Sequence, residues 1–199
     1  GAMSVKDRVV KTPDDLKGVK YAMVDLGPLA EIHSMAGGTP VQVGFGDLYM
    51  AIERGMADGS GGPNGSSLAS GIIPLLPYVT VFGEEWGKHT PIVAAFSHIV
   101  MGIDFYNNLP PDIRAIFDEL EPFLSEELAK AEMMSSDVAM KEAEKLGHNF
   151  TYLTREELKV WEDFAIPIHE KWIEEMEAQG KPARAIYEEA KRLIAEYNK

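Results

Sequence analysis

The sequence predicts an α/β protein, and three observations lead to that fold class. Strand-like and helix-like patterns alternate through residues 12–59, which is typical of parallel strands joined by right-handed crossovers. From residue 110 onward the pattern is mainly helical. The 199 residues are 45% hydrophobic, which is enough apolar material for a sizeable core.

Local signals place the first elements. Ordered structure is expected to begin at Thr12. Pro13 follows it directly and Asp15 follows three residues later, which is the pattern of a capped helical turn. Residues 19–24 are then predicted to form a strand. Residues 28–38 are predicted to form a helix that ends in two glycines.

That helix is expected to carry Leu29, Ile32 and Met35 on one apolar face. His33 lies beside Ile32 and is expected to be a surface or packing residue. Residues 39–45 are predicted to form a short strand in which Val41 and Val43 point to the same side.

A second helix over 46–55 leads into a turn, residues 59–65, that has almost no side chains. Glycine allows a backbone to approach something closely, and the sequence leaves two alternatives of equal weight. The turn either offers backbone N–H groups to a ligand, together with Asn64 and its serine neighbours, or it fills space or acts as a hinge.

The remaining patterns alternate less regularly. Residues 72–82 and 90–103 are strand-like runs whose prolines favour sheet edges or strand starts. Residues 110–147 predict a long helix that Pro122 kinks or interrupts. The last predicted elements are a short strand over 148–153, a helix capped by Thr154 and Glu157, and a helix over 182–197.

Charge and composition exclude several classes of function. The formal net charge of −13 argues against binding nucleic acid or an anionic membrane surface. The chain has no cysteine, so disulfides, thiolate catalysis and cysteine-bound zinc are excluded. No apolar run approaches the roughly 20 residues of a membrane helix, and no signal peptide is visible. Residues 1–3 resemble the remnant of a removed purification tag.

No group of residues in the sequence requires catalysis. His169 and Glu170 begin like a metalloprotease helix, but no second histidine follows at the required spacing, so a solvated helix face is expected there. Glu84, Glu85 and His89 contain ligand types that a metal accepts, although a polar loop tip is the more common explanation. A binding protein without catalysis, metal or cofactor is therefore expected.

Three segments carry a resemblance to a known family. They are residues 4–24, residues 37–63 and residues 105–123. The central segment matches a proline, aromatic, acid and glycine pattern at Pro40, Phe45, Asp47, Tyr49, Ala51, Ile52, Gly55, Asp58 and Gly59, and Leu109-Pro110 carries a later step. In this order the segments resemble the solute-binding subunits of tripartite ATP-independent periplasmic (TRAP) transporters, the dicarboxylate-receptor family.

The resemblance implies a periplasmic-binding-protein-like (type II) fold, in which two α/β lobes close on a small organic solute that is passed to a membrane permease. The chain resembles the C-terminal two-thirds of such a protein, with a partial second lobe and long C-terminal helices. Residues 4–82 would form lobe two, 83–109 would cross back to lobe one, and 110–199 would form a hinge-spanning helix and the C-terminal helices. Its location would be periplasmic.

The sequence departs from the family pattern at positions that contact the solute in the family. The family arginine that holds a ligand carboxylate corresponds to Ala22, and a ligand-contacting asparagine corresponds to Gly62, whereas the aromatic at Phe45 is kept. A buried carboxylate without its guanidinium partner is strongly penalised. We therefore expect a neutral or largely apolar ligand. The expected ligand-binding positions are Tyr21, Ala22, Met23, Phe45, Tyr49, Gly62 and Asn64.

Two alternatives remain open at this stage. The chain is either a solute receptor or a receptor-derived interaction protein that has lost its ligand. If the N-terminal third is missing, apolar strand edges and helix faces are uncovered, and a homodimer or exchange of elements with a second copy is expected.

Overall fold

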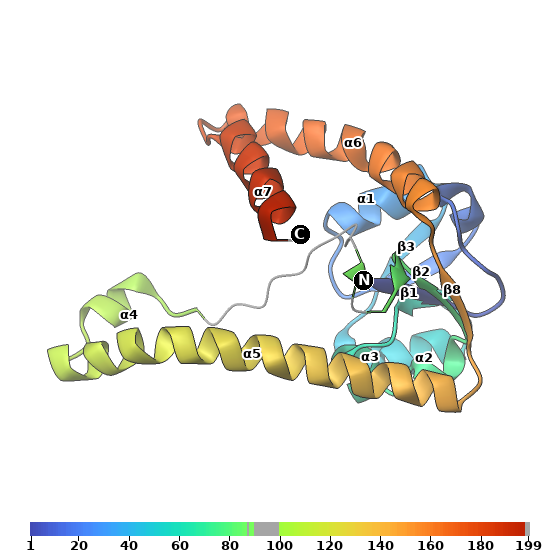
Figure 1. The fold of residues 1–199 in the computed structure, drawn as a ribbon, viewed down its shortest axis with the longest axis horizontal. Coiled ribbons are helices and arrows are strands. Elements are labelled where there is room, and N and C mark those ends of the chain that lie inside the picture. The colour runs from blue at the N-terminus through green and yellow to red at the C-terminus, as the bar shows by residue number, and fades with distance from the viewer. Residues whose placement is uncertain (87, 90–99, 198–199) are drawn as a thin grey trace.

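The computed structural model describes residues 1–86, 88–89 and 100–197, and its described part contains a six-stranded sheet with helices on both faces (Figure 1). The strands are β1 (Ala2–Val5), β2 (Lys20–Met23), β3 (Thr39–Gln42), β4 (Gly59–Gly61), β5 (Tyr78–Val81), β6 (Gly83–Glu85), β7 (Lys88–His89) and β8 (Asn149–Tyr152). The helices are α1 (Pro28–Met35), α2 (Leu48–Glu53), α3 (Gly65–Ala69), α4 (Ile103–Asn107), α5 (Pro111–Lys145), α6 (Arg155–Glu177) and α7 (Ala183–Tyr197), with 3-10 turns η1 (Pro13–Leu16), η2 (Phe45–Asp47) and η3 (Ile73–Leu75).

Five strands of the main sheet run in one direction. The strand order is β3-β2-β4-β1-β5-β8, in which β2 is parallel to β3 and β4, and β5 is parallel to β8. β1 is antiparallel to both of its neighbours, β4 and β5. The parallel arrangement expected from the sequence is present in this sheet, and the reversed strand β1 lies inside it.

β1 corrects one expectation. The sequence places the start of ordered structure at Thr12, but in the structure Ala2 pairs with Val81, and Met3 is buried against the main core. That residues 1–3 are the remnant of a tag stays a prediction. Strand β1 is short and has no period-2 pattern, because Met3, Ser4 and Val5 are all buried, on both faces of the sheet.

Two apolar layers cover the sheet. On one face, Tyr21 and Met23 pack with residues of α1 and with Trp161 of α6. On the other face, Ala22 packs with Ile52 of α2 and its neighbours, and α3 and α5 lie on the same side (Figure 1). The alternation of side chains along β2 thus divides its residues between two cores.

The buried face of α1 differs from the predicted one. Ile32 is buried as expected, but Met35 is 46% exposed and His33 is fully buried. The His33 ring lies 4.1 Å from the Tyr21 ring, and its Nδ1 is 2.9 Å from the Leu29 carbonyl oxygen. The packing alternative for His33 is therefore the correct one.

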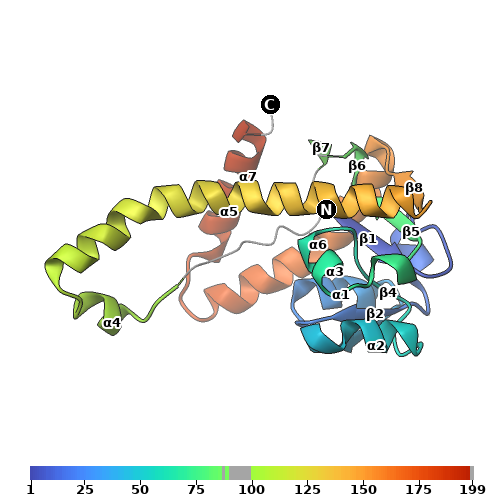
Figure 2. The same ribbon diagram turned by 90° about the horizontal axis from the view of Figure 1, so that it is seen from below.

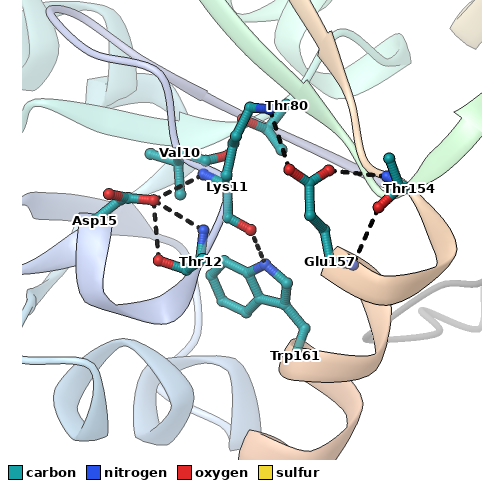
Figure 3. A network of polar contacts seen from close by, with 8 residues as sticks. All are labelled: Val10, Lys11, Thr12, Asp15, Thr80, Thr154, Glu157 and Trp161. Carbon is teal, nitrogen blue, oxygen red and sulfur yellow. Dashed lines mark hydrogen bonds and ion pairs between the residues drawn. The ribbon is translucent and has the colours of Figure 1, made fainter.

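A polar network fastens α6 to the first half of the chain (Figure 3). Trp161 Nε1 donates to the Lys11 carbonyl at 2.8 Å, and Lys11 Nζ pairs with Glu157 at 3.0 Å. Thr154 and Glu157 form the capping box that the sequence predicts, and Thr12 and Asp15 form the other. We call this set of contacts the α6 latch.

The latch also sets the charge state of its acids. Burial alone would raise the pKa of Asp15, but hydrogen bonds from the Thr12 and Lys11 N–H groups outweigh it and lower that pKa. The pKa of Glu157 is lowered by the Thr154 N–H group and by Lys11. Both carboxylates therefore stay ionised in neutral solution.

Helix α5 runs unbroken through Pro122 over 35 residues, so the expected interruption is absent. The two halves of the helix differ. Ala139, Met140 and Ala143 in the C-terminal half are buried against the sheet layer. The N-terminal half extends past the sheet together with α4, as Figures 1 and 2 show, and its apolar side chains are exposed.

Candidate functional site

The five parallel strands end at one edge of the sheet, which we call the carboxyl edge. β1 starts where they end, so the chain terminus labelled N in Figure 1 marks this edge. Helices α5 and α6 extend past it on opposite sides of the sheet (Figures 1 and 2). Ligands of open α/β sheets bind outside the carboxyl ends of the strands, which makes this edge the candidate site.

The strand order indicates where along the carboxyl edge the candidate site lies. Helix α1 connects β2 to β3 on one face, and α2 connects β3 back past β2 to β4 on the other face. The order of connection therefore reverses between β2 and β4. Such a switch point leaves a crevice at the ends of the two strands. Met23 ends β2, and Gly61 ends β4.

Three predicted site residues lie on β2 in the interior of the lobe. Tyr21 is 3% exposed and Met23 is 6% exposed, and both belong to the core beneath α1 and α6. Burial raises the pKa of the Tyr21 hydroxyl, which stays neutral. Ala22 is buried on the opposite face, beneath α2. Direct contact of these side chains with a solute stays a prediction.

Two predicted aromatic residues are accessible. Phe45 lies just past the end of β3, at the start of η2, and it is 46% exposed. Tyr49 is on the first turn of α2, and its hydroxyl donates to Glu53 at 3.3 Å. Sequence reasoning missed Leu26, which follows β2 on the same edge of the sheet and is half-exposed. The carboxyl edge therefore presents apolar side chains after two adjacent strands.

The bare turn has a structural explanation. A Cβ atom on Gly62 would lie 2.4 Å from Ala2 Cβ, and one on Gly59 would lie 2.8 Å from a Val5 methyl group. A Cβ on Gly65 would lie 2.6 Å from Ser135 of α5. These glycines allow β4 and α3 to approach their neighbours closely. A Cβ on Gly61 would meet only the Asn64 amide nitrogen, at an ordinary contact distance of 3.7 Å.

Asn64 is used in local structure. Its Oδ1 accepts from Ser67 N at 2.8 Å, and Ser67 Oγ accepts from Asn64 N at 2.8 Å. This capping box begins α3, which the sequence did not predict. A role of Asn64 in solute binding stays a prediction.

Basic groups near Ala22 have other partners. Lys20 lies two residues before Ala22, and its Nζ donates to the Gly55 carbonyl and lies 3.7 Å from Asp58. Five of the six arginines contact groups elsewhere: Arg8 with Asp7, Arg114 with Tyr106, Arg155 with Glu162, Arg184 with Glu170, and Arg192 with Glu189 and Glu196. The sixth, Arg54, is exposed at the C-terminal end of α2.

The metal and protease alternatives gain no support. In the described part of the chain no three acidic or histidine side chains come together as a metal site, and the side chain of His89 lies outside that part. His169 and Glu170 instead hold α7. His169 Nδ1 is 3.0 Å from the Tyr187 hydroxyl, and Glu170 pairs with Arg184 at 2.6 Å.

None of the described helices combines the length and the apolar composition of a membrane-spanning segment.

A groove of about 620 Å³ lies between α1 and α6, on one face of the sheet. Leu26 and Met35 contribute apolar surface, and Glu31 and Lys171 form an ion pair of 2.8 Å across it. Leu26 also belongs to the carboxyl edge, so the groove adjoins the candidate site.

This fold, an α/β lobe whose strands end at an exposed apolar edge, defines a solute-binding lobe. Comparison with known proteins gives the family. Residues 1–175 match the family model for bacterial extracellular solute-binding protein, family 7, and the chain belongs to that family. This is the TRAP receptor family of the sequence resemblance, and its members serve transport without catalysis.

Two curated relatives are similar over most of the chain. The C4-dicarboxylate-binding periplasmic protein DctP of Rhodobacter capsulatus is 25% identical over 84% of the chain and 48% of its own length. The ectoine-binding periplasmic protein TeaA of Halomonas elongata is 22% identical over 88% of the chain and 50% of its own length. The chain thus spans about half the length of these relatives.

Solved structures share the fold. A marine metagenome TRAP solute-binding protein specific for aromatic acid ligands, in complex with metahydroxyphenylacetate, has a TM-score of 0.80 at 18% identity, over 100% of this chain and 61% of the other. A TRAP solute-binding protein from Rhodoferax ferrireducens with copurified benzoate has a TM-score of 0.78 at 20% identity, over 98% of this chain and 60% of the other.

Proposed function

We propose that this chain is the extracytoplasmic solute-binding component of a TRAP transporter and that its solute is neutral or largely apolar. A periplasmic location is proposed with it, since both curated relatives are periplasmic proteins. The membrane partner would be a TRAP permease, to which this family delivers solutes.

The observation that carries the proposal is the exposed Phe45 at the carboxyl edge, next to strand β2, on which the buried Ala22 stands at the position of the family arginine. Ala22 brings no charge, five of the six arginines are engaged elsewhere, and Arg54 lies at the far end of α2. A carboxylate buried there would lack a guanidinium partner, which costs several kcal/mol. Phe45 offers a ring on which an aromatic solute stacks. The two structural relatives hold aromatic carboxylates, and it is the rings of these ligands, not their charge, that fit such a surface.

Calorimetric titration tests the charge of the solute. Benzamide, benzoate and succinate form a series from a neutral aromatic compound through an aromatic monoanion to an aliphatic dianion. We expect benzamide to bind at least tenfold more tightly than succinate, and Phe45→Ala to weaken benzamide at least tenfold. Phe105→Ala, at an aromatic that is 63% exposed on α4, is the matched control and should leave binding unchanged. Tight succinate binding would refute the assignment of a neutral solute.

A second candidate is an interaction protein that has lost its solute. The contact between Gly62 and Ala2 favours it, because the position of the family asparagine has no room for a side chain. A thermal-shift screen against small metabolites separates the candidates, since a ligand that binds only the native state raises the melting temperature. A screen without any shift would favour the interaction protein.

We also propose that the chain forms a homodimer. The support is the exposed apolar surface of α4 and of the N-terminal half of α5. Surfaces of this kind mark sites of association in soluble proteins.

A further inference from the structure

The parallel strands β3, β2 and β4 end side by side at the carboxyl edge. Met23 of β2 pairs with Gln42 of β3, and Tyr21 of β2 pairs with Gly59 of β4, a register that sets Met23 beside Gly61. These strands therefore finish level with one another, at the last residue of each. Neighbouring strands are about 4.8 Å apart, so β3 and β4 end roughly 10 Å apart, on the two sides of β2.

One accessible side chain follows each of these strand ends after the same number of residues. Phe45, Leu26 and Asn64 are each the third residue after the last residue of β3, β2 and β4. Phe45 and Leu26 are about half exposed, and Asn64 is partly exposed. We call these three residues the edge row. The row is apolar after β3 and β2 and polar after β4.

The amide group of Asn64 has a fixed orientation. Its Oδ1 accepts from Ser67 N at 2.8 Å. A backbone N–H group can only donate, so the oxygen of the amide must face Ser67 and the nitrogen must point elsewhere. Among residues 1–86, 88–89 and 100–197, no group accepts a hydrogen bond from Asn64 Nδ2. The capping box thus holds an N–H donor in one direction and leaves it unused.

That donor lies beside the end of β4. A Cβ atom on Gly61 would lie 3.7 Å from Asn64 Nδ2. Gly59, two residues earlier, points to the α1 face of the sheet, since its Cβ would lie 3.0 Å from the Tyr21 ring, and Gly61 points to the same face. Leu26 precedes α1 on that face. Asn64 Nδ2 therefore faces the crevice between the ends of β2 and β4.

The edge row selects for a particular chemistry. A neutral amide N–H satisfies a carbonyl oxygen that leaves water, but it does not compensate the much larger cost of burying a carboxylate. Because Oδ1 already accepts from Ser67, the row offers a donor and calls for an acceptor. A donor that is held in place before binding loses little rotamer freedom when the solute arrives.

We propose that the edge row binds an uncharged solute with an apolar ring at one end and a carbonyl oxygen at the other. The ring lies on Phe45 and Leu26, and the oxygen accepts from Asn64 Nδ2. The inference rests on the proposed function and names the chemical class of its solute. Asn64 is then a specificity-determining residue, because its donor has no use for a solute without an acceptor.

A matched pair of ligands tests the acceptor. Acetophenone and ethylbenzene have similar shapes, neither ionises in water near neutral pH, and only acetophenone has a carbonyl oxygen. Calorimetric titration of the parent chain should show acetophenone binding about fivefold more tightly than ethylbenzene. Equal affinities, or a preference for ethylbenzene, would overturn the proposal.

A cap-preserving substitution tests the donor. Asn64→Ser keeps an oxygen that caps α3 and removes the amide N–H groups. It should weaken acetophenone and benzamide about fivefold and leave ethylbenzene unchanged. Thr154→Ser, at the N-cap of α6, is the matched control and should leave all three unchanged. Equal weakening of acetophenone and ethylbenzene would show that Asn64 acts only through the fold of α3, and would overturn its role.

Phe45→Ala separates this inference from the proposed function. It should weaken all three ligands alike, because each of them has a ring. If it does so while Asn64→Ser leaves the ratio of acetophenone to ethylbenzene affinity unchanged, the solute site stands and the role of Asn64 is refuted. A parent chain that binds succinate more tightly than benzamide, or that binds none of these ligands, would refute the neutral solute and this inference with it.

Discussion

The lobe beneath α6 and the exposed half of α5 both carry apolar side chains, but only those beneath α6 are buried. Beneath α6, Trp161 is 1% exposed and the latch satisfies its indole N–H group. On α5, Phe123 is 58% exposed. Both regions therefore contain a helix with apolar side chains on one face. Only the face of α6 packs against other residues of the described chain. Helix periodicity indicates that a face will be covered and leaves open what covers it.

The largest effect is expected at the centre of the latch. Trp161→Ala removes a ring that packs edge-on against Phe82 at 5.3 Å and leaves the Lys11 carbonyl without its donor. We expect a loss of about 3–5 kcal/mol in the free energy of unfolding. Urea unfolding followed by circular dichroism measures it. Trp172→Ala is the control, because Trp172 is 39% exposed and its loss should cost much less.

Two methionines on α5 compare its halves directly. Met140 is 3% exposed and packs with Val79 and Val81, whereas Met134 is 69% exposed on the same helix. Met140→Ala should lower the unfolding free energy by about 2–4 kcal/mol, and Met134→Ala by less than about 0.5 kcal/mol. Both are measured below the concentration at which the chain dimerises. Equal losses would mean that the exposed half is covered in the monomer.

A glycine pair tests whether the bare turn serves packing. Gly62→Ala places a methyl group 2.4 Å from Ala2 Cβ and should cost about 1–3 kcal/mol as β1 shifts. Gly61→Ala meets only the Asn64 amide, at 3.7 Å, and should be close to neutral. The readout is the midpoint of thermal unfolding. A neutral Gly62→Ala would restore the alternative in which the turn is free to meet a ligand.

Sequence reasoning succeeded where the signals were local. The capping residues Thr12 and Thr154 mark helix starts correctly, and the positions of β2, β3 and β8 follow from short apolar patterns. It failed where tertiary contacts decide. The sequences of β1 and β4 show no alternation of apolar and polar residues, because these short strands form through pairing with neighbouring strands on both sides. His33 is read as ambiguous, because only the approach of Tyr21 determines its burial.

The candidate site was less accessible to the same reasoning. Phe45 lies at the carboxyl edge, where the family pattern puts an aromatic, but Leu26 carries no motif and became visible only when the strand order was known. Gly62 was interpreted through a lost ligand contact, whereas its neighbour in space, Ala2, belongs to a strand that the sequence did not predict. Site residues on one strand can be read locally, and the crevice between two strands cannot.

The smallest expected effect is on the pH dependence of stability, and it is tested by comparing the buried His33 with the less buried His169. Burial lowers the pKa of His33 below the ordinary 6.5, and its Nε2 has no hydrogen-bond partner among the described residues, so a second proton would be held without an acceptor. The unfolded chain therefore binds that proton more readily than the folded chain does. The stabilising contribution is complete above about pH 6.5 and is lost as the pH falls from there toward the folded pKa.

Urea unfolding of the parent chain between pH 7.5 and 5.5 should accordingly show stability falling by about 1 kcal/mol on the acid side, and His33→Phe should flatten that slope. The phenylalanine ring keeps the stack on Tyr21 and cannot titrate. His169→Phe is the control, since the pKa of His169 is also lowered by burial but the adjacent Glu170 opposes that shift. It should flatten the slope less. If His169→Phe had the larger effect, acid sensitivity would arise at the contact between α6 and α7 rather than in the lobe, and the lobe would be the more acid-resistant of the two regions.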